Sequence, residues 1–599
     1  MNEGNIDRSG PESGPYSGLY LGGMALTAGF LFCLLPFLVP LRTQPIPSFY
    51  AEWLALLLGL TGLPLLAAGR SPGFPRVVPF LVPRIALLPA GLAVCLLLQL
   101  AFAPAGTSTP ALIALLYLLW LTLLMLFATA LRQRVGLPRL ARWLAVALAL
   151  AAALNACSAI LWSAGMRAGL GWLFLMPSAG GNLGQVNMLV DLLWIGIVSA
   201  LYCRRNSRHA WAWSLLVPVL LLASALTGAR APLLYAVWLP VVAWLFGDRK
   251  SLRAACIAGA SYFLIVAAVH VVPPNVLAPM GDGAGNDSVA RISAGMRTAP
   301  GENVRLNLIR AAAEIAEDHP LLGSGWGSFS WESYHRASAN TGWWATGENA
   351  HQLFFQLAAE LGLPAAVFAL VMLLAWAGTI WRGRAGLRTQ PETGWAIAAA
   401  GVTLLHAQLE YPLWYAHLLG VCGILLACAE PKTFSFDVRP SRLAVGTVML
   451  VGVFLLGTTG VDYVRIQRWV YRDMNRANVP VPDAYYRELA AWGQGSLLQP
   501  QVIRILAAVM PPTRDHLDEK RVLCARALHG EPQSPAVFTC ALLDELAGEH
   551  ALAETNWRQA ARVFGAQLPA YLQKLEAVPS NVDADALAFA RRMQTTQTQ

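Results

Sequence analysis

The sequence predicts an all-α polytopic membrane protein with about thirteen transmembrane helices, a large outer loop and a C-terminal soluble helical domain. The chain has 599 residues, of which 56% are hydrophobic and 13% are charged, whereas a soluble protein carries about 25% charged residues. Apolar runs of about 20 residues, enough to cross a bilayer, recur between residues 18 and 459. Arg and Lys gather in every second loop between these runs, as in multi-pass proteins.

Thirteen apolar runs are predicted to span the membrane. They lie at 18–41, 50–68, 84–104, 110–131, 139–162, 186–204, 211–228, 231–247, 252–271, 363–381, 393–409, 412–428 and 441–459. The first run follows a short polar tail and is not followed by a small-residue cleavage site. We therefore interpret it as a signal anchor and not as a cleaved signal peptide.

The charge of the loops predicts the orientation, because basic loops stay in the cytoplasm. The alternate short loops contain only Arg42, Arg167 and Arg230 as positive charges. The N-terminal tail, 1–17, is then cytoplasmic, and the loop 272–362 lies outside. With an odd number of spans the C-terminal region lies outside as well. The net charge of +9 is explained by the inner loops and indicates no nucleic-acid partner.

The outer loop is predicted to contain two helices. The first runs from Glu302 to about Asp318 and ends at His319-Pro320, because the residue before Pro resists the α region. A glycine-rich turn, 323–329, follows, and its aromatic residues suit a membrane interface. The second helix is expected from Ala350 to about Leu361, leading into the next span.

The C-terminal region is also predicted to be helical. We expect helices at 461–476, 483–494, 500–509, 516–528, 534–547, 551–564 and 566–577, separated by prolines. The run from Ala541 to Phe564 is typical of one tetratricopeptide-like helix pair, and it fits an ordinary helical hairpin equally well. Cys524 and Cys540 both lie here, and an oxidising compartment would allow a disulfide between them.

His351 is the candidate reaction centre. It lies at the end of the outer loop, between Asn349 and Gln352, just before the chain re-enters the membrane. Imidazole titrates near neutral pH and can act as a general base. A lone His is more often structural, but this position makes the catalytic and structural interpretations equally strong.

Other strongly polar residues lie near the outer ends of the spans, where each has a cost of roughly 2.5–3.5 kcal/mol at membrane depth. Arg230 suits a phosphate or carboxylate because of its planar donor fork, and we prefer this role to that of an interfacial snorkelling Arg. Glu410, followed by Tyr411, either contacts substrate or serves as a structural partner for Arg230 or another Arg.

Amides and further arginines complete the set of candidates. Gln185 and Asn187 open the sixth span, where they either cap the helix or line an outer cavity together with Asp191. Arg305 and Arg310 are five residues apart and so do not share a helix face. The outer loop has no Asp-x-Asp, and the chain has no His-x-x-x-His or Cys-x-x-Cys. The sequence therefore does not support a metal site.

Together these motifs resemble the O-antigen ligase and polymerase superfamily. The broad resemblance is carried by Arg305, by residues 319–327, by Asn349-Ala350-His351-Gln352 and by Glu360-Leu361-Gly362. A narrower resemblance, to the bacterial protein O-oligosaccharyltransferases of the PglL type, is carried by residues 181–187, by residues 406–415 and by the soluble extension. The resemblance covers about 180–428, while the first five spans match in hydropathy only. The family often has Asn in place of Gln352 and Trp in place of Ile309.

The resemblance implies a GT-C-like glycosyltransferase in the bacterial inner membrane, with its active site facing the periplasm. The implied donor is a polyprenyl diphosphate carrying a glycan, and the acceptor is a Ser or Thr hydroxyl of an exported protein such as type IV pilin. His351 would be the essential loop His, and Arg230 and Arg305 would hold the diphosphate. The implied substrate-binding set is completed by Gln185, Asn187, Asn349, Glu410 and Tyr411. Neither a metal nor another cofactor is implied.

The predicted domains follow from this interpretation, and three other functions stay open. The transferase domain is 18–459, with the catalytic loop 272–362 inside it, and a periplasmic helical domain occupies 460–599. A lipopolysaccharide O-antigen ligase would use the same donor with a lipid-A core acceptor, and an O-antigen polymerase would make longer glycans. A lipid or solute transporter would place ionisable residues near the midplane. The polar residues at the outer face favour an enzyme, and the soluble tail favours a protein acceptor.

Overall fold

The computed structural model confirms the predicted all-α class. It describes residues 16–68, 79–102, 108–166, 178–205, 207–271, 304–339, 347–474, 483–577 and 582–597. The two strands found among these residues, β1 (Phe80–Pro83) and β2 (Thr433–Phe436), form one short antiparallel pair. The start of the N-terminal tail and the first part of the outer loop, 272–303, lie outside the described residues.

Each of the thirteen predicted spans contains a helix. In chain order these are α1 (Tyr16–Leu34) with η1 (Leu35–Leu38), α2 (Phe49–Thr61) with α3 (Pro64–Ala67), η2 (Arg84–Ala86) with α4 (Leu87–Phe102), α5 (Ser108–Val135), α6 (Leu137–Ser163), η4 (Gly181–Leu183) with α7 (Val186–Arg205), α8 (Ala210–Leu226), α9 (Ala231–Phe246), α10 (Arg249–Val271), α15 (Leu363–Leu387), α16 (Pro391–His406), η5 (Pro412–Trp414) with α17 (Ala416–Ala429), and α18 (Arg442–Met474). Within the described residues, eight helical segments are long and apolar enough to cross a membrane, and four shorter apolar helices accompany them. The protein is thus a multi-pass membrane protein.

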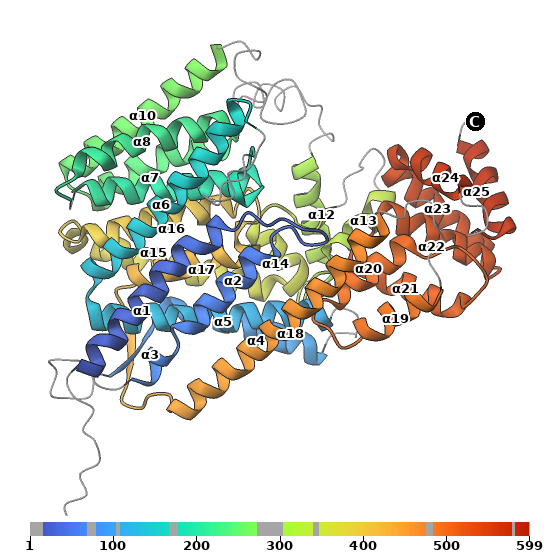
Figure 1. Cartoon of the computed structure of the whole chain (residues 1–599), viewed down its shortest axis with the longest axis horizontal. Helices are drawn as coiled ribbons and strands as arrows, with labels where there is room; N and C mark the ends of the chain where they lie inside the picture. Colours follow the sequence, from blue (N-terminus) through green and yellow to red (C-terminus); the bar gives the residue numbers. More distant parts are fainter. Residues whose placement is uncertain are drawn as a thin grey trace, which may run out of the picture.

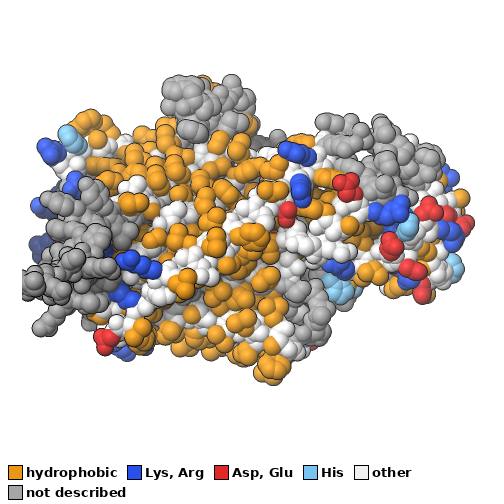
Figure 2. Space-filling model, turned by 60° about the horizontal axis from the view of Figure 1, so that its bottom comes forward, with side chains coloured by type: hydrophobic (Ala, Val, Ile, Leu, Met, Phe, Trp, Pro, Cys, Tyr) orange, Lys and Arg blue, Asp and Glu red, His pale blue; other side chains and the backbone are white. Residues whose placement is uncertain are grey.

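The basic loops lie together at one end of the bundle. The β1–β2 pair joins two of them, and Arg132 donates to the carbonyls of Cys428 and Glu430 at 3.0 and 2.9 Å. Arg439 donates to the carbonyl of Ala68 at 2.9 Å. In Figure 2 a broad hydrophobic band separates the positive side chains at the left from the mixed charges at the right. This arrangement fits alternate loops on opposite sides of a membrane.

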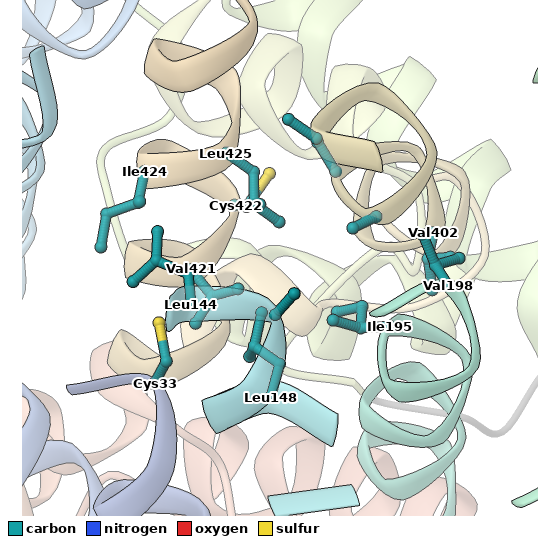
Figure 3. Close-up of a cluster of buried hydrophobic side chains, with 14 of the residues drawn as sticks. Cys33, Leu144, Leu148, Ile195, Val198, Val402, Val421, Cys422, Ile424 and Leu425 are labelled. Atoms are coloured by element: carbon teal, nitrogen blue, oxygen red, sulfur yellow. The ribbon is translucent and has the colours of Figure 1, made fainter. Parts of the chain in front are cut away.

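Helix α7 lies at the centre of the bundle, with 83% of its spanning segment buried. Figure 3 shows Leu148 of α6, Ile195 of α7 and Val402 of α16 in one apolar cluster, to which α1 and α17 also contribute. Small residues allow close approach, as is common in membrane bundles: a Cβ added to Gly196 would lie 2.2 Å from the Cβ of Ala152 on α6. The tight packing makes α7 a rigid support for polar residues at its outer end.

Three helices are described in the outer loop: α12 (Val304–Asp318), α13 (Phe329–Ala339) and α14 (Leu353–Leu361). The first ends directly before His319-Pro320, as predicted. The last begins at Leu353 and not at Ala350, so His351 precedes the helix. Helix α13 was not predicted. Of the two aromatic residues in the predicted turn 323–329, Phe329 is fully buried and begins α13, whereas Trp326 is partly buried.

The last spanning helix carries the C-terminal helices, which lie beyond one end of the bundle in orange to red (Figure 1). They are α19 (Asp483–Gly493), α20 (Gln499–Val509), α21 (Leu517–Gly530), α22 (Ser534–Leu546), α23 (His550–Phe564), η6 (Gly565–Gln567), α24 (Leu568–Ala577) and α25 (Ala584–Gln597). All but α25 correspond to predicted helices. Cys524 on α21 and Cys540 on α22 are joined by a disulfide.

Helix α13 joins the outer loop to the C-terminal helices, between which it lies in Figure 1. The ring of Trp331 stacks on His529, with centroids 4.6 Å apart. Tyr334 stacks on Phe564, and Gln559 donates to the carbonyl of Tyr334 at 3.1 Å. The aromatic side of α13 is therefore covered by the tail and not by lipid.

Candidate active site

His351 is held in an unusual backbone conformation at the start of α14. Its φ is +56°, a left-handed value that is uncommon for a residue other than Gly and is often found at functional sites. On its two sides, Ala350 N donates to Gln356 Oε1 at 2.6 Å and Leu353 N donates to the carbonyl of Ala407 at 2.9 Å. Gln352 caps the helix by accepting from Phe355 N at 2.7 Å. These bonds fix the chain on both sides of His351.

Glu410 is the centre of the site. Its Oε2 lies 2.8 Å from His351 Nδ1, and its Oε1 accepts from Asn187 Nδ2 at 2.9 Å and from the guanidinium of Arg305. Only 5% of the Glu410 side chain is exposed, against 23% for His351. Four predicted residues from α12, α7, the outer loop and the α16–α17 connection therefore meet at one carboxylate.

The surroundings of Glu410 favour its charged form. Burial by itself would raise its pKa, but the hydrogen bond with His351 and the charge of Arg305 lower the pKa below its ordinary value. An ionised carboxylate can only accept hydrogen bonds, so His351 Nδ1 must carry the proton between them. His351 Nε2 is then left with a free lone pair and can act as a base.

Tyr411 and Gln185 form an aromatic and amide wall beside His351. The rings of His351 and Tyr411 meet edge to face with centroids 5.2 Å apart, and Tyr411 stacks on Tyr415. The hydroxyl of Tyr415 donates to Gln185 Oε1 at 2.7 Å. Burial raises the pKa of Tyr411, so its phenol stays neutral. Tyr415 was not singled out from the sequence, although it stands in the quoted run 406–415.

The other predicted residues occupy less central places. Arg230 is exposed at the N-terminal end of α9, and the ion pair of Glu410 is made with Arg305 instead. Asn349 is buried, and its Oδ1 has no hydrogen-bond partner among the described residues. Cys524 and Cys540 belong to the C-terminal helices and do not contribute to this cluster.

An apolar groove of about 290 Å³ begins next to the site. It is lined by α4, α5, α14, α15 and α17, and it includes Leu353, two residues after His351, and Leu413, three residues after Glu410. Trp326 and Trp414 stack with nearly parallel rings at its wall, with centroids 6.1 Å apart. The charged cluster therefore lies beside a hydrophobic groove between helices.

The side chain of Glu360 holds the glycine-rich turn in place by hydrogen bonds to its backbone. Its Oε1 accepts from Gly327 N and Phe329 N at 3.0 and 3.1 Å, and burial raises its pKa to about 7. Gly323 has a φ of +68°, and a Cβ there would lie 2.3 Å from the carbonyl carbon of Glu360. Only glycine fits such a close approach. The turn thus holds Trp326 in place over the groove.

The C-terminal helices reach the segment that carries His351. Arg504 of α20 lies 4.0 Å from Glu348, three residues before His351, and also pairs with Glu531. Within the described residues, no three His, Cys, Asp or Glu side chains lie together as a metal site would require. The ionisable groups that meet at the site are one His, one carboxylate and one Arg.

Comparisons with known proteins found matches over much of the chain. Residues 215–370 match the family model described as O-Antigen ligase, and residues 394–576 match the model described as Virulence factor membrane-bound polymerase, C-terminal. The chain is also 24% identical to a General O-oligosaccharyltransferase of Acinetobacter baylyi over 412 residues. This aligned region covers 64% of this chain and 68% of that relative. The first match contains Arg305 and His351, and the second contains Glu410. Residues 215–370 and 394–576 thus resemble these two families, and the chain resembles the bacterial protein O-oligosaccharyltransferases.

Proposed function

We propose that the protein transfers a glycan from a polyprenyl diphosphate to Ser or Thr hydroxyls of exported proteins such as type IV pilin, at the periplasmic face of the inner membrane. The observation that carries this proposal is the carboxylate of Glu410, which joins His351, Arg305 and Asn187 beside an apolar groove. The relative named as an O-oligosaccharyltransferase supports a protein as the acceptor.

The donor suits both parts of this site. An isoprenoid tail has no polar atoms and fits the apolar groove, whose wall on α17 extends from Leu419 to Leu426, about 10 Å at 1.5 Å per residue. The diphosphate would then lie at the charged cluster beside the groove. Arg305 uses only some of its five N–H donors on Glu410, so the others can hold phosphate oxygens. Arg230, at the exposed start of α9, is the second cation in this proposal.

The reaction is a single displacement at C1 of the first sugar. The acceptor hydroxyl oxygen forms a bond to C1, and its proton passes to His351 Nε2. The bond between C1 and the diphosphate oxygen breaks, and its electron pair leaves with the diphosphate, whose growing charge Arg305 stabilises. Glu410 keeps the imidazole in the required tautomer and stabilises its charged form. One displacement inverts the configuration at C1.

His351→Ala provides the direct test. The wild-type chain and the variant are reconstituted in liposomes with a polyprenyl-diphosphate glycan and a pilin acceptor, and intact mass shows whether sugar is added. We expect the variant to be present in the membrane but to transfer no glycan. His550→Ala, which changes an exposed His of the tail, is the matched control and should be active. Undiminished transfer by His351→Ala would exclude His351 as the base.

The same reconstitution decides between acceptors, because the two matching families are described as a ligase and a polymerase. A lipid-A core oligosaccharide replaces the pilin in one reaction, and the lipid-linked glycan alone is incubated in another. Modification of the lipid-A core would indicate a ligase, and a ladder of longer glycans would indicate a polymerase. Transfer is expected to persist in excess EDTA, since the proposed leaving-group stabilisation comes from arginine; loss of transfer restored by Mg²⁺ would contradict this.

A further inference from the structure

A second polar cluster lies inside the helix bundle, one helix turn deeper than Glu410. His406 Nδ1 is 2.7 Å from Asp191 Oδ1, and the hydroxyl of Tyr235 donates to the same oxygen at 2.6 Å. The three side chains come from α16, α7 and α9, and none is more than 1% exposed. The proposed reaction does not use any of them.

Such a cluster needs an explanation because ionisable groups within a membrane bundle are costly and usually functional. Asp191 Oδ2 is buried and has no hydrogen-bond partner among the described residues, which adds a desolvation cost. Trp194 packs edge to face on Tyr235, with ring centroids 5.9 Å apart. With at most 1% of each side chain exposed, the three residues are buried too deeply to contact a substrate directly.

Two members of the cluster stand next to a residue of the site, and the third lies on the helix that follows one. Asp191 follows Asn187 by one turn of α7, and Asn187 donates to Glu410. The backbone carbonyl of His406 accepts from Glu410 N at 2.8 Å. Tyr235 lies five residues after Arg230, at the outer end of α9. One carboxylate thus connects the three elements that present Asn187, Glu410 and Arg230.

We propose that Asp191, with His406 and Tyr235, is the positioning centre of the active site: it fixes the outer ends of α7, α9 and α16 so that Glu410 meets His351. The proposal rests on the transferase function proposed above. A misplacement of about 1 Å at a reacting group can lower the rate about 100-fold. Loss of this centre should therefore lower kcat, with a smaller effect on the KM for the lipid donor, whose tail lies in a separate groove.

Asp191→Asn tests the proposal because Asn keeps the size of the side chain and removes its charge. We expect kcat to fall at least about 10-fold, with the KM for the donor changed less than about threefold. Ser199→Ala is the matched control. Ser199 accepts from Trp395 Nε1 at 3.1 Å in another buried bond between α7 and α16, two turns further from the site. It should leave kcat close to that of the wild type.

A double-mutant cycle separates positioning from general loss of structure. If Asp191 acts through Glu410, then Asp191→Asn combined with Glu410→Gln should have the kcat of Glu410→Gln alone, within about threefold. Independent, multiplying losses would overturn the proposal, as would equal kcat values for Asp191→Asn and Ser199→Ala.

A milder variant and the wild type complete the test. If Asp191→Asn does not accumulate in the membrane, Tyr235→Phe, which removes one hydroxyl, carries the same test: it supports the proposal if it lowers kcat and is non-additive with Glu410→Gln, and overturns it otherwise. A wild-type chain that transfers no glycan refutes the proposed function itself. A wild-type chain that is active, with unaffected cluster variants, refutes only the positioning role.

Discussion

The replacement of Glu410 by Gln is the most informative single change in this protein. Gln has nearly the same size and shape, but it has one acceptor oxygen and no charge. Glu410 uses one oxygen for Arg305 and Asn187 and the other for His351. If the amide oxygen faces Arg305, the NH₂ group faces His351 Nδ1. His351 must then carry its proton on Nε2 and can no longer act as a base.

The expected loss follows from these contacts. A hydrogen bond to a charged group contributes about 1.5–3 kcal/mol, and every 1.36 kcal/mol in the activation barrier changes the rate tenfold. Loss of the bond between Glu410 and His351 should therefore lower kcat about 10- to 160-fold. The tautomer change adds to this loss, so kcat should fall at least about 10-fold.

The assay is single-turnover glycan transfer to a pilin acceptor in liposomes, with saturating lipid-linked donor. Gln408→Ala is the control, because Gln408 lies two residues away and its side chain, within the described part of the chain, makes neutral hydrogen bonds, with Gln352 at 2.9 Å and with the carbonyl of Leu404 at 3.3 Å. It should retain most of its activity. A Glu410→Gln variant within about threefold of the wild type would refute the assignment of Glu410 as the partner of His351.

Three further changes test other parts of the site. Arg305→Lys should lower kcat at least about 10-fold, because Lys cannot reproduce the planar donor fork; wild-type transfer by this variant would contradict a role at the diphosphate. Glu360 has a raised pKa of about 7, so the protonated form stabilises the fold and this stabilisation is lost as pH rises through 7. The apparent unfolding temperature in detergent should fall between about pH 4.5 and pH 7 in the wild type and less in Glu360→Gln; parallel curves would contradict this. Arg504→Ala should lower transfer no more than about fivefold, since its contact with the exposed Glu348 is a weak surface pair; complete loss would show that the tail does more than support the loop.

Local signals were sufficient to predict much of the fold. Apolar runs identified the spans because a bilayer requires long hydrophobic helices. Proline ended helix α12 at Asp318, as the backbone restriction before proline requires. The start of α14 was placed too early, because Gln352 caps the helix with its side chain and Gln is not among the usual capping residues.

Long-range contacts explain what could not be predicted. Helix α13 has a rather polar sequence, and its aromatic side is covered by the tail: Trp331 meets His529, almost 200 residues later in the chain. The sequence did not decide whether Arg230 or another Arg pairs with Glu410, because Arg230 and Arg305 both lie at the outer ends of predicted helices. Only the packing of α12 against α14 brings Arg305 to the carboxylate.

The site illustrates why polar residues of a membrane enzyme are easier to find than to pair. A charge in an apolar run is conspicuous, so Glu410 and Arg230 were both noted from the sequence, whereas Tyr235 is a single aromatic residue in an apolar helix and gives no such signal. Its role depends on Asp191, which faces it across the bundle at 2.6 Å. The outer ends of α7, α9 and α16 are joined at that one carboxylate. A change in the buried cluster should therefore move Glu410 relative to His351, although none of the hydrogen bonds described joins the cluster to His351 directly.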